Sequence, residues 1–397
     1  MMTFTRNSPN QLLVNPRLSE AEKAVFKELQ REFDLKVTSV DHFLIASSGS
    51  TQKNNSSAKL IALSQAAVLN SAARFNLYFK AGTSDHWGLV LPKYHVAGLG
   101  IFARAQLAGA NVHEREWQVK DLSGWIQGWI HQNGIKFISL VPAQIFDVVN
   151  SVVSAPVGLR KVFVGAGALD PELRTRALAL SWPLCETYGM TETASMIAVK
   201  EQELFRALPG IEIKTEAGIL NVKCNSLLSA TIQKVEEQII INQFIDNDWF
   251  ATEDLATIEG TTKATDKATD KATIGFRFLG RQGDYIKILG EGVSLNELRS
   301  QIARLATANG YNPAEFELIA LDGGRAGFRL ILTVEGADTY TKAEKLMSLY
   351  NLSCRPFEKI AKCVVVGQIP RTALGKLKTE DLKLIVREII KEIITKD

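Results

Sequence analysis

A loop rich in hydroxyl groups is the first feature of this chain that could do chemistry. Ser47-Ser48-Gly49-Ser50-Thr51 follows a predicted strand. The backbone N–H groups and hydroxyls of such a loop can surround a polyphosphate. It is not a Walker A loop, because the chain contains no G-x-x-x-x-G-K-[ST]. Alone, a Ser/Gly loop is more often a plain connection, so its meaning depends on the motifs that accompany it.

The cysteines do not indicate a metal centre or a disulfide framework. The chain has four of them, with no C-x-x-C pair and no histidine at metal-ligand spacing. They are Cys185, Cys224, Cys354 and Cys363. We expect small, buried apolar side chains at these positions.

The elements that must position the candidate groups show two hydrophobic periodicities in turn, that of strands and that of helices. Ser19 and Glu22 form the S-x-x-E capping box of a first helix that we expect to end near Phe33. Short β-rich runs then alternate with stretches of helical period. The predicted strands are 43–46, 60–63, 88–91, 137–141 and 161–164, and the predicted helices include 64–75 and 122–131. This alternation predicts an α/β domain with a largely parallel sheet.

The pattern changes twice further along the chain. Between residues 210 and 258, short strands separated by turns predict an antiparallel subdomain or a small barrel. Residues 263–273 repeat Lys-Ala-Thr-Asp, which we interpret as an enlarged hairpin loop. After residue 283, predicted helices at 294–306, 342–349 and 379–394 and strands near 316–321 and 327–334 indicate a small α+β domain.

Length and composition set the class of protein. The 397 residues allow two or three domains, and 46% hydrophobic with 22% charged residues is typical of a globular chain. The 46 Lys+Arg nearly balance the 43 Asp+Glu, so charge does not indicate a nucleic-acid or membrane partner. No apolar run approaches the roughly 20 residues of a membrane helix, and no secretory leader is apparent. We expect a cytoplasmic protein without membrane insertion.

Six further motifs follow the Ser/Gly loop in a fixed order. They are Leu91-Pro92-Lys93-Tyr94-His95-Val96-Ala97-Gly98, Val164-Gly165-Ala166-Gly167-Ala168, Tyr188-Gly189-Met190-Thr191-Glu192-Thr193, Trp249-Phe250-Ala251-Thr252-Glu253-Asp254, Gly280-Arg281-Gln282-Gly283-Asp284-Tyr285-Ile286-Lys287 and Pro370-Arg371-Thr372-Ala373-Leu374-Gly375-Lys376. Together they resemble the adenylate-forming superfamily of acyl-CoA synthetases, peptide-synthetase adenylation domains and luciferases. The likeness extends from about Ser47 to Lys376. It implies an enzyme that uses ATP, Mg²⁺ and CoA.

The resemblance assigns nucleotide and catalytic roles. Activating a carboxylate at the α-phosphate of ATP requires fixed donors, a cation and a metal ion. Glu192 offers a hard oxygen ligand for Mg²⁺, and the Thr191 hydroxyl can donate to the α-phosphate. The implied nucleotide-binding residues are Ser47, Ser48, Gly49, Ser50, Thr51, Lys59, Gly165, Ala166, Gly167, Tyr188, Gly189, Asp254 and Arg281. Lys376 is the implied catalytic lysine, which bridges the carboxylate and the phosphate as charge develops.

The acyl side of the site resembles one branch of the superfamily. Residues 94–101, 107–110, 188–195 and 290–293 are similar to blocks of the 2-succinylbenzoate–CoA ligases of menaquinone synthesis. The likeness implies that Tyr94 and His95 lie at the mouth of the acyl pocket. Because the acid of that family is a dianion, Ser195 and Arg104 are candidates for its distal carboxylate. Arg104 could equally be a surface charge.

The resemblance also implies a domain organisation. It predicts layered, mostly parallel sheets with helices and a small β subdomain in a large domain over residues 1–281, shortened at its N-terminus relative to the family. Residues 282–283 would form a hinge at Gly283, and residues 284–397 a mobile α+β domain that carries Lys376. Gly290, Glu291 and Gly292 would face CoA.

Two departures leave other functions open. The segment between Thr51 and Lys59 is four residues longer than the family loop and lacks its Gly and Pro, which puts the pyrophosphate contacts in doubt. One alternative is a ligase for another acid, or one that loads a carrier-protein thiol. Another is a nucleotide-binding protein that has lost catalysis. The sequence leaves open whether the chain forms a homodimer.

Overall fold

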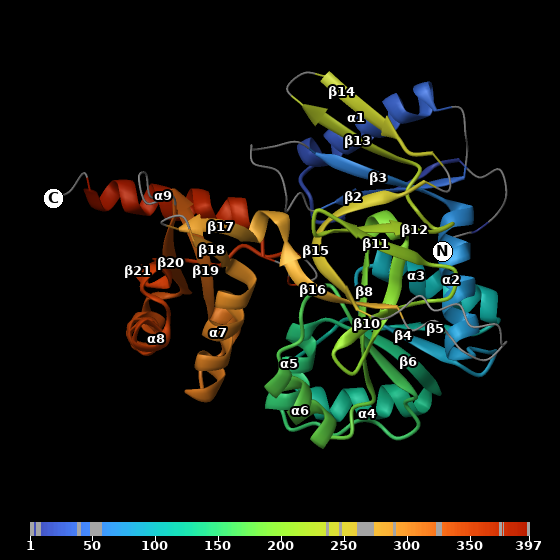
Figure 1. Cartoon of the computed structure of the whole chain (residues 1–397). Helices are drawn as coiled ribbons and strands as arrows, with labels where there is room; N and C mark the ends of the chain where they lie inside the picture. Colours follow the sequence, from blue (N-terminus) through green and yellow to red (C-terminus); the bar gives the residue numbers. More distant parts are fainter. Residues whose placement is uncertain are drawn as a thin grey trace. The chain divides into compact units, whose positions relative to one another are not determined.

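The computed structural model describes residues 4, 9–37, 41–47, 58–235, 238–245, 248–259, 274–288, 291–322, 328–372, 375 and 377–394. The chain divides into two compact units. The first includes residues 56–252 and 256–278, and the second includes residues 253–255 and 279 onward. Each unit has its own sheets and its own apolar cores (Figure 1).

Two sheets form the frame of the first unit. The smaller has the order β1-β2-β3-β13-β14 and the larger β11-β12-β15-β16-β10-β9-β8-β7-β6-β4-β5. The smaller sheet contains β1 (Gln11–Leu13), β2 (His42–Ser47), β3 (Lys59–Ser64), β13 (Ala230–Val235) and β14 (Gln238–Gln243). The larger contains β4 (His86–Leu89), β5 (Val112–Glu114), β6 (Ile135–Leu140), β7 (Lys161–Val164), β8 (Leu184–Met190), β9 (Ser195–Glu201), β10 (Leu204–Ala207), β11 (Glu212–Glu216), β12 (Ile219–Lys223), β15 (Phe250–Glu259) and β16 (Gly275–Arg281).

The strands that lead to the site pair in parallel. β4 pairs with β5 and β6, β6 with β7, and β7 with β8, all in parallel. From β8 onward the pairing is antiparallel, because β9 and β10 follow through short turns. Parallel pairing requires crossover helices, which the chain supplies between these strands. The α/β fold class expected from the sequence is confirmed.

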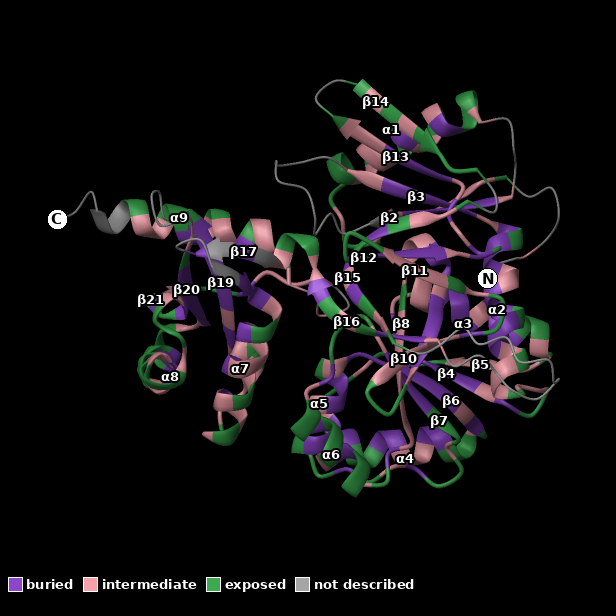
Figure 2. Ribbon diagram, in the orientation of Figure 1, coloured by how far each residue is buried: buried purple, intermediate pink, exposed green. Residues whose placement is uncertain are grey.

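Buried residues line the central strands of the sheets (Figure 2). Because successive side chains of a strand point to opposite faces, both faces of these strands are covered. Leu44 of β2 packs with Leu29 and Phe33 of helix α1 (Glu20–Lys36), whereas Phe43 and Ile45 face the opposite side. That opposite core includes residues of α2 (Gln65–Phe79) and α3 (Val96–Ala108). Helices α2 and α3 therefore lie between the two sheets.

The larger sheet has the same two-sided arrangement. Phe75 of α2 contacts the rings of Phe137 and Phe163, at centroid distances of 6.1 and 5.0 Å. The neighbouring residues Ile138 and Val162 point the other way, into a core with α4 (Leu122–Gln132), α5 (Pro142–Asn150) and α6 (Pro171–Ala179). Helix layers thus cover both faces of the parallel strands.

The second unit is an α+β arrangement. Its three-stranded sheet has the order β19-β20-β21, with β19 (Phe316–Asp322), β20 (Phe328–Glu335) and β21 (Ile360–Val366). Helices α7 (Leu295–Ala308) and α8 (Tyr340–Ser353) pack on one face, and α9 (Thr379–Ile394) packs on the other. A hairpin of β17 (Tyr285–Ile288) and β18 (Glu291–Ser294) precedes α7.

Local sequence signals account for several of these elements. The capping box is present, since the Glu22 N–H donates to Ser19 Oγ and the Ser19 N–H donates to the Glu22 carboxylate. Helices α3, α5 and α6 were not expected from the sequence. No helix was predicted at 96–108, because α3 is apolar around most of its circumference, contains two glycines and shows no distinct polar face.

The predictions for the antiparallel strands, the repeat tract and the cysteines have different outcomes. The antiparallel strands expected between residues 210 and 258 are present and are shared between the two sheets. The Lys-Ala-Thr-Asp tract at 263–273 lies outside the described residues. All four cysteines are free; Cys224 and Cys363 are buried as expected, but Cys185 and Cys354 are only partly so, because neither side chain is enclosed by a core. Within the described chain, no helix combines the length and apolarity needed to cross a membrane.

Candidate functional site

The parallel strands of the first unit bring three sequence motifs to one edge of the sheet. The segment with Tyr94 and His95 follows β4, residues 165–167 follow β7, and Tyr188 to Met190 end β8. Because β4, β6, β7 and β8 are parallel neighbours, their carboxyl ends lie along the same edge. Ligands of open α/β sheets bind at such an edge. The candidate site is built there.

A tight corner between β8 and β9 holds the Thr-Glu pair. Any side chain at Gly189 would collide with the carbonyl oxygen of Ser195, so the two strands meet closely only because residue 189 is glycine. A short 3₁₀ turn, Thr191–Thr193, occupies the corner. The buried Thr193 hydroxyl lies 2.8 Å from the Ser195 carbonyl and 3.1 Å from the Met190 N–H. The corner thereby presents Thr191 and Glu192 at the surface of the site.

Lys59 and Glu192 meet at this corner. Lys59 is the first residue of β3, and its Nζ lies 4.0 Å from the Glu192 Oε1. Both side chains are about one-fifth exposed, which leaves them open to a ligand. A cation and a carboxylate this close can hold a phosphate and a divalent metal ion side by side.

Arg104 and Ser195, which are 91 residues apart, also come together. The Arg104 Nη2 donates to the Ser195 Oγ at 3.0 Å. The guanidinium lies over the ring of Phe75 at 4.3 Å and near that of Trp87 at 5.7 Å. Arg104 is therefore not a surface charge. It is 3% exposed and belongs to the layer between the two sheets.

The charge of Arg104 is poorly compensated. No carboxylate of the described chain forms an ion pair with it, and its buried Nε has no hydrogen-bond partner there. Burial lowers the pKa of Arg104 to about 10. A buried guanidinium without an anion costs free energy unless something else pairs with it. The backbone at Ser195 is also strained, with φ of 96° after an Ala194 φ of 51°.

His95 lies at the N-terminal end of α3 and makes no capping hydrogen bond there with its side chain. Its ring is 4.7 Å from that of Tyr94. Burial lowers the pKa of His95 to about 4, so the imidazole is neutral near pH 7. Gly98 has to be small, because a Cβ there would lie 2.5 Å from the Pro92 carbonyl oxygen. That close approach fixes where the Tyr94-His95 segment enters the helix.

An aromatic cluster surrounds the candidate adenine-stacking residue. The Tyr188 ring lies 5.0 Å from Phe276, 5.8 Å from Phe205 and 6.1 Å from Phe278. Ala166 has a left-handed φ of 65°, and a Cβ at Gly165 would lie 2.8 Å from the Thr187 Oγ1. The loop after β7 thus runs close against β8, with Ala166 and Gly167 exposed.

The candidate ribose residues form an ion pair in the second unit. Asp254 of β15 is 4% exposed. The Arg281 Nε lies 3.1 Å from the Asp254 Oδ1. Gly283 follows in a 3₁₀ turn, Gln282–Asp284, where an added Cβ would meet no atom within 4 Å.

Part of the predicted site lies outside the described residues. This applies to Ser48, Gly49, Ser50, Thr51, Gly290 and Lys376, to the side chains of Ser47 and Glu291, and to the burial of Gly292. Their roles stay predictions. The described part of the chain also contains no cluster of three or more His, Cys, Asp or Glu that could hold a metal ion.

Sequence reasoning missed the residues that support the site. Thr193 fixes the corner, and Phe75 and Trp87 enclose the Arg104 guanidinium. The T-E-T triplet was a usable signal for Thr193. No local signal could have identified Phe75 and Trp87, because they approach Arg104 only through the packing of α2 and β4.

The AMP-binding enzyme family matches residues 14–224, more than half of the chain. These residues include the glycine loop after β7, the Thr-Glu corner and Arg104. The chain belongs to the AMP-binding enzyme family. The family match contains all the described site residues of the first unit and ends before Asp254.

Known AMP-binding proteins resemble the chain over different lengths. A 2-succinylbenzoate–CoA ligase of Staphylococcus epidermidis is 26% identical over 185 residues, which are 44% of this chain and 38% of that protein. The ligase of the same name from Bacillus pumilus is 22% identical over 387 residues, 92% of this chain and 73% of that protein. The chain thus aligns with under two-fifths of the first of these relatives.

The fold agrees with a solved structure. The o-succinylbenzoate CoA synthetase of Bacillus subtilis, in complex with the acyl-adenylate intermediate OSB-AMP, superposes with a TM-score of 0.72 at 20% identity. The match covers 94% of this chain and 83% of that chain. At this identity the likeness concerns the fold.

The low pKa of His95 predicts a pH-dependent stability. Between pH 4 and 6.5 the unfolded chain binds a proton at His95 that the folded chain does not, so stability falls as the pH falls. From pH 7 to pH 5 the wild type should lose about 2 kcal/mol more than His95→Gln. Urea unfolding followed by tryptophan fluorescence measures this, because all six tryptophans precede residue 250. Equal losses in both proteins would show that His95 titrates normally.

Proposed function

We propose that this chain activates a carboxylic acid with ATP and transfers the acyl group to CoA, with 2-succinylbenzoate as the acid. The observation that carries the proposal is the buried guanidinium of Arg104, which is bonded to Ser195 and has no carboxylate of the described chain beside it. Its partner Ser195 begins β9 directly after the turn that holds Thr191 and Glu192. The names of the related ligases agree with this substrate.

A dianionic acid fits this arrangement of charges. One carboxylate must react at the α-phosphate, so the other must be bound without reacting. The Arg104 guanidinium and the Ser195 hydroxyl can both donate to that second carboxylate, and the rings of Phe75 and Trp87 make the surroundings apolar. A carboxylate would supply the charge that Arg104 lacks, and an aromatic acid would match the rings beside it.

The proposed reaction has two steps. The acid carboxylate oxygen attacks the α-phosphorus of ATP, and pyrophosphate leaves with the bonding electrons. The CoA thiolate then attacks the acyl carbonyl, and AMP leaves. The sum converts acid, ATP and CoA to acyl-CoA, AMP and pyrophosphate, with the thiol proton passing to solvent or to a product oxygen. We place this reaction in the cytoplasm, where ATP and CoA are available.

Several residues of the first unit would each contribute to adenylation. The Lys59 ammonium and the Thr191 hydroxyl would donate to phosphate oxygens, and Tyr188 would stack on the adenine. His95, being neutral near pH 7, can accept or donate a hydrogen bond to the reacting carboxyl without adding charge. Tyr94 would close the pocket mouth beside it.

The residues present suit magnesium bound together with ATP. Glu192 supplies one accessible hard carboxylate, and Mg²⁺ usually takes one or two carboxylates together with phosphates and waters. Glu192 would hold the ion, which when bound would neutralise charge on the phosphates. The described chain contains no cluster of three or more His, Cys, Asp or Glu, which agrees with an ion that takes most of its ligands from phosphates and waters.

Residues after the family match would supply the remaining groups. Asp254 and Arg281 would bind the ribose hydroxyls, and Lys376 would approach the α-phosphate. We propose that residues 282–283 are the hinge between residues 1–281 and 284–397, with Gly283 as the pivot. Gly290, Glu291 and Gly292 would then face CoA during the second step.

Pyrophosphate release over a panel of acids tests the function. With Mg²⁺ and ATP, 2-succinylbenzoate should release pyrophosphate well above the level with benzoate or hexanoate. Addition of CoA should then yield AMP and a thioester in equal amounts. Release with another acid would redirect the substrate assignment, and acyl transfer only to a carrier-protein thiol would redirect the acceptor. No release with any acid would favour a nucleotide-binding protein without catalysis.

Removing the amine of residue 376 should separate the two half-reactions. We expect Lys376→Ala to lower the rate of pyrophosphate release about 100-fold or more, because one charge is lost from the transition state. Thioester formation from a supplied acyl-adenylate should change less than about threefold. Lys378→Ala, which removes only an ion pair to Asp381, is the matched control. Equal losses in both half-reactions would contradict the role of Lys376.

Arg104 should control recognition of the acid. Arg104→Gln should raise the KM for 2-succinylbenzoate about 100-fold and leave the KM for ATP unchanged, since about 2–3 kcal/mol of charge-assisted hydrogen bonding is lost. Arg74→Gln is the matched control, because this second buried arginine is bonded to Pro209, Asn225 and Ser226 instead. A similar rise for both substrates, or for both variants, would remove Arg104 from the acid pocket.

A further inference from the structure

The second unit contains a chain of four alternating charges that nothing above uses. The Arg299 Nη1 lies 2.8 Å from the Asp284 Oδ1, and the Arg299 Nε lies 3.1 Å from the Glu317 Oε1. The other oxygen of Glu317, Oε2, lies 3.4 Å from the Arg371 Nη2. Glu317 is thus the carboxylate that two arginines share.

This chain of charges is largely sheltered from solvent. The Glu317 side chain is 11% exposed and that of Arg299 is 19% exposed. Ion pairs this sheltered are screened less than surface pairs, and losing one partner leaves the other charge uncompensated. Arg299 Nε also donates to the Leu318 carbonyl at 2.9 Å, which fixes the guanidinium against β19.

At one end, the charges hold the segment that leads to Lys376. Arg371 forms a β-bridge with Leu377, and the Lys378 N–H donates to the Pro370 carbonyl at 2.9 Å. The Gly375 N–H donates to the Thr372 carbonyl at 2.8 Å. The Arg371 side chain donates back to the Gly375 carbonyl at 3.4 Å. The described residues at the base of this segment, Pro370, Arg371, Thr372, Gly375 and Leu377, are therefore bonded to one another and tied to Glu317 through Arg371.

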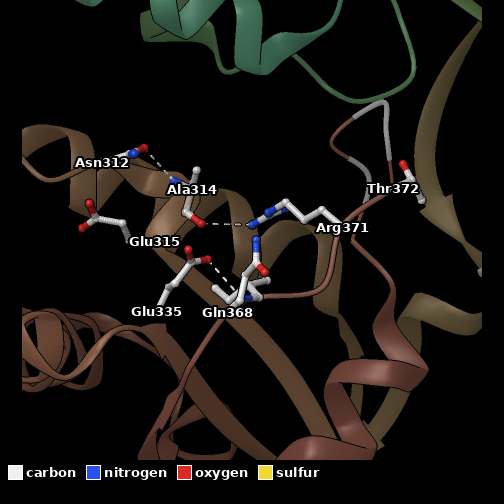
Figure 3. A pocket seen from close by; sticks show the side chains of 8 residues that line it. Asn312, Ala314, Glu315, Glu335, Gln368, Arg371 and Thr372 are labelled. Carbon is white, nitrogen blue, oxygen red and sulfur yellow. Dashed lines mark hydrogen bonds between the residues drawn. The ribbon is translucent and has the colours of Figure 1, made fainter. Parts of the chain in front are cut away.

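Arg371 lies on the polar side of the segment. Figure 3 shows Arg371 reaching to the Ala314 carbonyl beside an open hollow, with Thr372 further along the same segment. The hollow has a volume of about 390 Å³ and polar walls that include Glu315, Glu335 and Gln368. The two ends of the segment pack against an apolar core, through Ile369 just before it and through Leu377. The polar contacts of Arg371 therefore fix the part of the segment that borders the hollow.

At the other end, the charges hold the residue that follows Gly283. Asp284 is bound by Arg299, and Arg281 on the preceding side is bound by Asp254. Gln282 and Gly283 lie between these two ion pairs. The backbone that changes conformation in the proposed hinge motion is thus limited to two residues, and the residues from Asp284 onward would move as one body.

We propose that Glu317 is a positioning residue that fixes the Lys376 segment to the residue after the hinge, through Arg371 on one side and Arg299 with Asp284 on the other. The inference rests on the proposed function for its effect on catalysis. Its effect on the segment itself does not depend on any activity.

Amide hydrogen exchange tests the inference without a substrate. In Glu317→Gln, the amides of Gly375 and Lys378 should exchange about tenfold faster or more, because a charged hydrogen-bond partner is lost. Amides of β20 should keep the wild-type rate, which shows that the unit is folded. Glu315→Gln is the matched control, since Glu315 pairs with Lys342 instead of Arg371. Unchanged exchange at Gly375 and Lys378 would overturn the inference.

A second variant keeps the inference testable if Glu317→Gln does not fold. Arg371→Gln should give at least the increase seen in Glu317→Gln, because it also removes the donations to the Ala314 and Gly375 carbonyls, while it leaves the Arg299–Glu317 contact intact. The double variant Glu317→Gln with Arg371→Gln should exceed Arg371→Gln alone by less than about twofold, because the Glu317–Arg371 contact is already lost in that single variant. Independent, multiplying effects would contradict a shared contact.

The rates of the two half-reactions distinguish a positioning role of Glu317 from a general effect on stability. Glu317→Gln should lower the rate of pyrophosphate release about tenfold with an unchanged KM for ATP, while thioester formation from a supplied acyl-adenylate changes less than about threefold. Equal losses in both steps would mean a merely structural role. A wild-type protein that releases no pyrophosphate would refute the proposed function, whereas the exchange experiment would still decide whether Glu317 holds the segment.

Discussion

The contact between Gly189 and the Ser195 carbonyl is the constraint on which the candidate site depends. It lets β8 turn into β9 within four residues, and the turn exposes Thr191 and Glu192 on one side. On the other side it places the Ser195 hydroxyl against the Arg104 guanidinium. The residues proposed to bind phosphate and carboxylate thus come from one short corner.

Burial of Arg104 has a structural cost that its surroundings only partly offset. The rings of Phe75 and Trp87 and one hydroxyl contact the guanidinium, yet no described carboxylate does. A structural role alone would be served better by an apolar side chain of similar volume. Arg74 illustrates the contrast, since oxygen atoms from three residues satisfy its guanidinium. The unbalanced charge of Arg104 is therefore best explained by an anionic ligand.

The second unit relies on polar contacts around Glu317. The shared carboxylate of Glu317 joins Arg299 and Arg371 through two ion pairs, and a small sheet with helices on both faces supplies the support. In the first unit, by contrast, backbone contacts and packing hold the functional groups. The two units thus use polar and apolar means for the same purpose.

The sequence by itself determined the class of fold, the capping box of α1, the order of the motifs and the family resemblance, because these depend on local periodicity and on short strings of residues. Whether Arg104 was a surface charge or a buried group could not be decided there. Packing of α2, α3 and β4 decided it, by enclosing the guanidinium and setting it against a residue 91 positions away. The same holds for Glu317, whose partners lie 18 residues before and 54 after it. Such contacts arise from how strands pair and helices pack, which no local pattern of side chains specifies.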